Sequence, residues 1–156
     1  GTLAQNGLRR RSGGEGGFGP LANPPMKELL ILVVDDVDEI RNLVRLWLRE
    51  NGHVVETAAC GRDAARLLRT QAFDLVITDI IMPDGDGLEL IIELKKARPD
   101  VHVLAMSGGG THLRAADCLR VAKGLGAQAM LLKPFNRQQL LAGVNQAYPA
   151  QDAAAS

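Results

Sequence analysis

The stretch Leu75-Val76-Ile77-Thr78-Asp79 decides how the rest of this 156-residue chain is interpreted. It predicts a buried strand, because apolar and β-branched residues follow one another until the run stops at a carboxylate. Three further apolar runs have the same form and stop at Asp35-Asp36, at Ser107 and at Lys133. The carboxyl ends of parallel strands meet at one edge of an open α/β sheet, where such folds bind their ligands. We therefore expect three carboxylates, a hydroxyl and an ammonium group to lie together at that edge.

Apolar runs alternate with helical patterns along the middle of the chain. The predicted strands are 29–34, 53–57, 74–78, 101–106 and 128–132, and the predicted helices are 38–50, 62–70, 88–97, 112–124 and 136–147. This alternation predicts the α/β class, with a doubly wound parallel sheet of five strands covered by helices on both faces. The first, third and fourth strands are the most apolar and should be central, which gives the flavodoxin-like order 2-1-3-4-5.

The composition is that of an ordinary globular domain, with 46% hydrophobic and 23% charged residues. The formal net charge of zero provides no basic field for nucleic acid or for a membrane surface. No apolar run approaches the ~20 residues that span a bilayer. Cys60 and Cys118 lie far apart without metal-ligand spacing, which favours reduced thiols in a cytoplasmic protein.

The two ends of the chain differ from its middle. Residues 1–25 are rich in Gly, Pro, Asn and Ser, which predicts a disordered leader or an added arm, with Met26 as a candidate natural start. Arg9-Arg10-Arg11 is similar to a twin-arginine export signal, but glycines follow where such a signal needs an apolar segment. We expect an ordered domain over 26–149 and a flexible tail over 150–156.

The predicted cluster of carboxylates suits a divalent cation. Carboxylates held close together repel one another, and Mg²⁺ relieves this cost with oxygen ligands while it keeps several waters. Asp35 and Asp36 would hold the metal, and Asp79, alone at its strand end, would be the nucleophile. Lys133 would pair with a phosphoryl oxygen and Ser107 would offer its hydroxyl to another. These groups together predict phosphoryl transfer onto an aspartate.

Each of these residues also has a purely structural interpretation. An acidic pair after a strand is often a helix cap, and Lys-Pro at a strand end is often only a stop signal. The placement of such residues at the ends of four strands favours a joint functional site. Asp84-Gly85-Asp86-Gly87 lacks the closing Glu of a calcium loop, and Gly108-Gly109-Gly110 lacks the ending of a P-loop.

The chain from Leu29 to Tyr148 resembles a response-regulator receiver domain of the chemotaxis-regulator type. The resemblance rests on Val33-Val34-Asp35-Asp36, Ile77-Thr78-Asp79, Met82-Pro83-Asp84-Gly85-Asp86-Gly87, Ser107 and Lys133-Pro134-Phe135. It implies a bacterial two-component phosphoprotein that takes a phosphoryl group on Asp79 from a sensor histidine kinase or a phosphotransfer protein of a phosphorelay. It also implies that Mg²⁺ is bound by Asp36, Asp79 and the backbone carbonyl of Ile81, with Asp35 acting partly through water. The Lys133–Pro134 bond would be cis, and catalysis would be limited to the chain's own phosphorylation and dephosphorylation.

The resemblance also implies how the signal leaves the site. Phosphorylation would draw Ser107 inward and shift the surface formed by helix 112–124, strand 128–132 and helix 136–147, which would bind a downstream protein. The aromatic residue that usually responds, three positions before the lysine, is replaced by Met130, whose flexible side chain can repack.

Two further departures from the family pattern lead to expectations. Gly108-Gly109-Gly110 predicts a mobile loop, followed by His112 as a surface or capping residue. Ile81 and Gly109 occupy the positions that influence attack by water, and neither can orient a water molecule, which predicts slow self-dephosphorylation.

Three functions compete at this stage. The first is a stand-alone, phosphorylation-switched module that is a monomer before phosphorylation. The second is a receiver taken from a longer regulator with a DNA-binding or enzymatic output domain. The third is a metal-dependent phosphatase with Asp79 as nucleophile, which needs a general acid or base two residues later, where this chain has Ile81.

Overall fold

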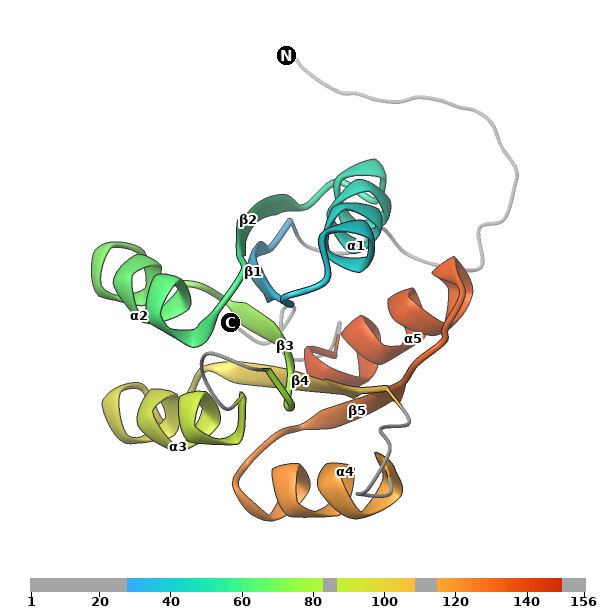
Figure 1. The fold of residues 1–156 in the computed structure, drawn as a ribbon. Coiled ribbons are helices and arrows are strands. Elements are labelled where there is room, and N and C mark those ends of the chain that lie inside the picture. Colours follow the sequence, from blue (N-terminus) through green and yellow to red (C-terminus); the bar gives the residue numbers. More distant parts are fainter. Residues whose placement is uncertain (1–27, 83–86, 109–114, 150–156) are drawn as a thin grey trace.

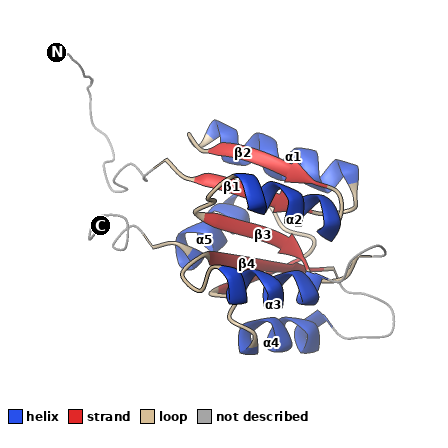
Figure 2. Cartoon of the chain, turned by 90° about the vertical axis from the view of Figure 1, so that its left-hand side faces the viewer, coloured by secondary structure: helices blue, strands red, loops and turns tan. Residues whose placement is uncertain are grey.

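The computed structural model of the chain describes residues 28–82, 87–108 and 115–149. Strands and helices alternate along them: β1 (Leu30–Val34), α1 (Asp38–Glu50), β2 (Val54–Ala58), α2 (Gly61–Thr70), β3 (Leu75–Asp79), α3 (Gly87–Ala97), β4 (His102–Ser107), α4 (Ala115–Gly124), β5 (Ala129–Leu132) and α5 (Arg137–Ala147). The five strands form one parallel sheet in the order β2-β1-β3-β4-β5. Helices α1 and α5 cover one face, and α2, α3 and α4 cover the other (Figures 1 and 2). The predicted fold class and strand order are confirmed.

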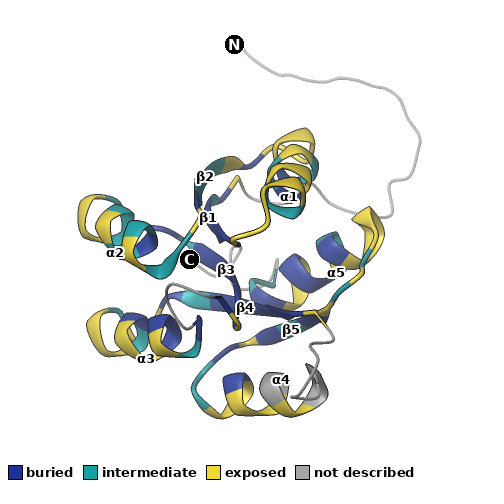
Figure 3. Ribbon diagram, viewed as in Figure 1, coloured by how far each residue is buried: buried dark blue, intermediate teal, exposed yellow. Residues whose placement is uncertain are grey.

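Two apolar clusters lie on opposite faces of the sheet, because successive residues of a strand point to opposite sides. On the α2–α3–α4 face, Leu32 and Val76 pack with Leu90 of α3. On the α1–α5 face, Ile77 and Leu104 pack with side chains of both helices. All five residues of β3 are buried, and Figure 3 shows the central strands dark and the outer helix surfaces exposed. This double coverage explains why the strand sequences are continuously apolar rather than alternating.

Three strands begin and end one residue later than the sequence predicted, as Val54–Ala58, Leu75–Asp79 and His102–Ser107. Asp79 and Ser107 are the last residues of strands β3 and β4. Their positions are set by the hydrogen bonding of the sheet, which is stiffer than a loop.

Several predictions concern residues outside the described ranges and stay predictions. These are the leader 1–25, the tail 150–156, the glycine segment from Gly109 onward with His112, and the turn residues Asp84–Asp86. Within the described part of the chain, no helix is long and apolar enough to cross a membrane.

Candidate functional site

The carboxyl edge of the sheet carries the five polar residues that the sequence predicted at the strand ends. Asp35 and Asp36 follow β1, Asp79 ends β3, Ser107 ends β4, and Lys133 follows β5. The parallel register places Asp79 beside Met106 and Ser107 beside Leu132. Residues separated by almost a hundred positions are thus brought to one edge, at the point where the chain order of the strands reverses between β1 and β3.

Lys133 joins two of the carboxylates directly. Its Nζ lies 2.7 Å from Asp35 Oδ2 and 2.9 Å from Asp79 Oδ2, and it donates a hydrogen bond to each. Asp35 is completely buried and Asp79 is 6% exposed. A single ammonium group therefore holds two buried carboxylates, which without it would repel each other at close range.

The remaining oxygens of these two carboxylates have backbone partners. The N–H of Val37 donates to Asp35 Oδ1 at 2.9 Å, and the N–H of Ile81 donates to Asp79 Oδ1 at 3.0 Å. Arg41 donates to the backbone oxygen of Asp35 at 2.7 Å, which ties α1 to the same loop. The two side chains are therefore held in fixed orientations before any ligand arrives.

The protonation of the site follows from burial and from this ion pair. Burial raises the pKa of Asp79 above its usual value, and the opposing effects of the Ile81 N–H and of Lys133 do not cancel it. Burial lowers the pKa of Lys133, but its hydrogen bonds and charge interactions with Asp35 and Asp79 outweigh burial, so its pKa is raised. Lys133 thus remains a cation. Burial disfavours the ionised form of Asp79.

The three carboxylates are close enough to share one cation. One oxygen atom each from Asp35, Asp36 and Asp79 lies within 4.8 Å of the others. Asp36 is exposed, so the cluster is open to solvent on one side. An all-oxygen donor set with room for water, and a carboxylate whose ionised form burial disfavours, fits Mg²⁺. Ile81, whose backbone carbonyl is the further predicted ligand, lies beside the cluster through its hydrogen bond to Asp79.

Ser107 is buried at this edge with an unusual feature. Its side chain is fully buried, and its hydroxyl has no hydrogen-bond partner among the described residues. Its backbone oxygen accepts from the N–H of Lys133 at 2.9 Å. A buried hydroxyl without a partner costs free energy, so the hydrogen-bonding capacity of Ser107 is unused among the described residues.

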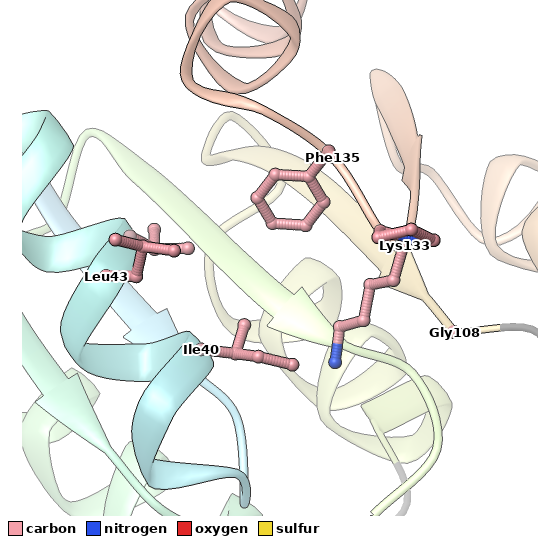
Figure 4. Close-up of a pocket in the computed structure, with 7 residues that line it drawn as sticks. Ile40, Leu43, Gly108, Lys133 and Phe135 are labelled. Carbon is pink, nitrogen blue, oxygen red and sulfur yellow. The ribbon is translucent and has the colours of Figure 1, made fainter.

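A pocket that the sequence did not reveal opens beside Lys133. It has a volume of about 520 Å³ and is lined by Ile40, Leu43, Val44, Gly108, Lys133, Pro134 and Phe135. Figure 4 shows the aliphatic stem of Lys133 crossing between β5 and α1, with Phe135 above it. In the sequence, the signal for this pocket was Leu43, an apolar residue on the polar outer face of α1. In the structure its side chain is 42% exposed.

Two expectations about the β5 segment can be compared with the structure. The Lys133–Pro134 bond is cis, as predicted. Met130 is half-buried and packs against the apolar cluster on the α2–α3–α4 face.

Comparison with known proteins identifies the family of the chain. Residues 31–145 match the family model of the response regulator receiver domain. The DNA-binding transcriptional regulator NtrC of Azospirillum brasilense is 37% identical over 78% of this chain and 24% of its own length. The response regulator MprA of Mycolicibacterium vanbaalenii is 40% identical over 72% of this chain and 47% of its own length. The chain thus spans about a quarter to a half of these relatives.

Solved structures give the same result at the level of the fold. The receiver domain of NtrX from Brucella abortus superposes with a TM-score of 0.70 at 34% identity, covering 75% of this chain and 96% of that one. The chemotaxis response regulator CheY4 of Vibrio cholerae superposes with a TM-score of 0.69 at 30% identity, covering 78% of this chain and 99% of that one.

Proposed function

The chain belongs to the response regulator receiver domain family, and from this premise we propose that it is a phosphoryl-accepting switch of a two-component system. Asp79 takes the phosphoryl group from a phosphohistidine of a sensor kinase or a phosphotransfer protein. The observation that carries the proposal is the position of Lys133 Nζ between the buried carboxylates of Asp35 and Asp79. Receiver domains are signalling modules rather than metabolic enzymes, and the proposed chemistry is confined to Asp79.

In the proposed reaction, a carboxylate oxygen of Asp79 attacks phosphorus while the bond to the donor nitrogen breaks. The electron pair of that bond stays on the imidazole of the donor, and an acyl phosphate forms on Asp79. Mg²⁺ held by Asp36, Asp79 and the Ile81 carbonyl, with Asp35 partly through water, would neutralise charge on the phosphoryl oxygens. Lys133 would exchange its contact with Asp79 Oδ2 for a phosphoryl oxygen while it keeps Asp35. The Ser107 hydroxyl would donate to another phosphoryl oxygen.

The apolar pocket beside Lys133 supports a binding surface for the phosphodonor protein next to the site. A macromolecular donor must cover the carboxyl edge, where Val37 precedes α1 with an exposed apolar side chain and the exposed Leu43 lines the pocket beside Lys133. Burial of such side chains contributes about 25 cal/mol for each Å² of apolar surface.

We expect Leu43→Asp to slow phosphoryl transfer from a phosphorylated histidine phosphotransfer domain, with unchanged labelling by acetyl phosphate. Equal transfer rates in Leu43→Asp and the wild type would contradict this docking site, and Ile92→Asp, exposed on α3, is the control.

The proposed output surface lies on α4, β5 and α5. Val121 of α4 is 51% exposed and Leu132 of β5 is 52% exposed, which supports contact with a downstream protein. A second candidate function is control of a further domain of a longer regulator. The length of the relatives favours it, since this chain spans only 24% of NtrC and 47% of MprA. In both cases Asp79 performs the same chemistry.

The experiment is incubation of the protein with Mg²⁺ and acetyl phosphate, followed by mass spectrometry. We expect one phosphoryl group on Asp79, no labelling of Asp79→Asn, and normal labelling of Asp63→Asn, which alters a carboxylate on α2 that pairs with Arg66. Beryllofluoride with Mg²⁺ should shift the amide resonances of Asp79, Ser107 and Lys133. Full labelling of Asp79→Asn, or an unchanged amide spectrum, would contradict the proposed function.

A further inference from the structure

The peptide group that joins Asp79 to Ile80 is held at both of its polar ends. Its N–H, on Ile80, donates to the backbone oxygen of Met106 on β4 at 3.0 Å. Its C=O, on Asp79, accepts a hydrogen bond of 2.9 Å from the Thr78 hydroxyl. Because a peptide group is planar and trans, these two bonds point in opposite directions and together fix the plane.

The first residue of α3 packs against the same peptide group. A Cβ atom on Gly87 would lie 2.0 Å from the Asp79 oxygen and 2.5 Å from Ile80 Cα. Only glycine permits an approach of this kind without displacement of one backbone by the other. The Asp79 oxygen is therefore in close contact with both the Thr78 hydroxyl and the start of α3.

Thr78 occupies a place that an apolar side chain would fill well. It is fully buried, and its register partners Val34 and Ala105 belong to the apolar cluster on the α2–α3–α4 face. A hydroxyl in such surroundings costs free energy unless it is hydrogen-bonded. Here the Thr78 hydroxyl donates its hydrogen bond to the backbone oxygen of Asp79, the residue proposed to carry the phosphoryl group.

We propose that Thr78 and Gly87 are positioning residues for phosphoryl acceptance, which fix the peptide after Asp79 and thereby the direction of its carboxylate. The link is short, because the Ile81 N–H that holds Asp79 Oδ1 at 3.0 Å lies one residue beyond the fixed peptide. Thr78 acts through the backbone. The part of the inference that concerns rates rests on the proposed function of Asp79.

A purely structural role for Thr78 predicts a different outcome. If the hydroxyl bonds to the nearest oxygen only to lower its burial cost, then valine, which has nearly the same shape, should replace threonine without loss. Serine would be the worse replacement, since it removes a buried methyl group. The positioning role reverses this order, because serine keeps the hydroxyl and valine does not.

The experiment compares Thr78→Val, Thr78→Ser and the wild type. The measurements are the Ile81 amide resonance in metal-free protein, Mg²⁺ affinity, the maximal rate of labelling by acetyl phosphate, its half-saturating concentration, and the thermal midpoint. We expect Thr78→Val to weaken the Ile81 hydrogen bond, seen as an upfield shift and faster amide exchange. We also expect weaker Mg²⁺ binding and a maximal rate lower by about tenfold, at an unchanged half-saturating concentration and an equal or higher midpoint. Thr78→Ser should restore the rate and the Ile81 resonance at a lower midpoint.

The control is Thr70→Val, which removes a similar bond from a threonine hydroxyl to a backbone oxygen, 3.0 Å long, on the exposed end of α2. It should change none of these values. An Ile81 resonance and a labelling rate in Thr78→Val that match the wild type would overturn the positioning role. Failure of the wild type to be labelled would instead contradict the proposed function, and in that case the Ile81 amide and Mg²⁺ affinity still decide whether Thr78 orients the site.

Discussion

Among single residues, Lys133 is the one that balances the charges of the buried carboxylates Asp35 and Asp79. Its side chain is 12% exposed and its two partners are buried, so the three charges are largely shielded from water. Loss of one member of a buried ion pair leaves an uncompensated charge and costs about 3–5 kcal/mol. We expect Lys133→Ala to lower the free energy of unfolding by about this amount without Mg²⁺, and Mg²⁺ to restore part of it, as measured by urea unfolding.

Arg137→Ala is the matched control for this prediction. Arg137 Nη2 lies 3.9 Å from Glu50 Oε1, and each side chain is about half-exposed. Surface pairs of this kind contribute about 0–1 kcal/mol to the free energy of unfolding. A loss below 1 kcal/mol in Lys133→Ala, equal to that of the control, would mean that Asp35 and Asp79 do not need the ammonium group.

Ile81 bears on the lifetime of the proposed acyl phosphate. Its side chain is 46% exposed beside Asp79 and carries no group that could hold a water molecule. We therefore expect slow self-dephosphorylation in the wild type and faster decay in Ile81→Asn, measured by loss of label after removal of the donor. One oriented hydrogen bond of about 1 kcal/mol corresponds to roughly a fivefold change in rate. Decay of Ile81→Asn at the wild-type rate or below it would refute the expectation, and Ile81→Val, which adds no polar group, should decay like the wild type.

For single residues, the sequence predicts which side chains lie at the site but not which of them are buried and which are exposed. Asp35 and Asp36 are adjacent in a recognisable pair, yet the first is buried against Lys133 and the second is exposed. That difference depends on the direction in which the chain leaves β1, which no local pattern encodes. The contact of Thr78 with the Asp79 oxygen escapes prediction for the same reason, since a threonine in a strand is explained equally well by β-propensity.

At the scale of elements, α3 is in direct contact with the backbone of the site. Its first residue, Gly87, lies against the Asp79–Ile80 backbone with no room for a side chain. We expect Gly87→Ala to push the start of α3 away from β3 and to lower stability by about 1–3 kcal/mol, measured by urea unfolding. Gly124→Ala is the control, because a Cβ there meets nothing within 4 Å and alanine is the better helix former. Equal stability of the two variants would show that α3 moves without cost.

Element types and their order follow from the sequence because the buried strands are long apolar runs and the helices show a clear 3.6-residue pattern. The boundaries are less well determined, as β2, β3 and β4 show by their shift of one residue. Hydrogen bonding to a neighbouring strand decides whether Asp79 or Ser107 still belongs to the sheet, and that partner is distant in sequence. Helix α5 is the opposite case, because its start is encoded locally by the capping box of Asn136 and Gln139.

Across the whole molecule, the two edges of the sheet differ in character. The carboxyl edge gathers the charged residues of the site, whereas the opposite edge, where β1 and β2 begin, holds His53 in the core. His53 is 5% exposed, and its Nδ1 accepts the N–H of Leu29 at 3.1 Å. Nε2 must therefore carry the proton, and it has no partner among the described residues. The neutral ring joins the start of β1 to the turn between α1 and β2.

This arrangement makes the stability of the whole fold depend on pH. Burial lowers the pKa of His53 from 6.5, against the opposing charge of Glu28. Above the unfolded value of about 6.5 both states are neutral, and His53 adds no pH dependence. Below it the unfolded chain binds the proton more readily, so the free energy of unfolding falls with pH until the folded pKa is reached. Protonation of the folded ring would also place an N–H against the Leu29 N–H.

The test uses His53→Asn, because Asn Oδ1 can accept the Leu29 N–H but does not titrate. Urea unfolding of both proteins between about pH 8 and pH 5 covers the range in which the unfolded histidine becomes charged. The variant will be less stable near pH 8, because the smaller side chain leaves a gap in the core. We expect the difference between the two proteins to stay constant down to about pH 7 and then to shrink as the wild type loses stability. If the difference in the free energy of unfolding stays constant down to pH 5, His53 takes up its proton equally in the folded and unfolded states. The surroundings of His53 would then be more open to water than its burial indicates.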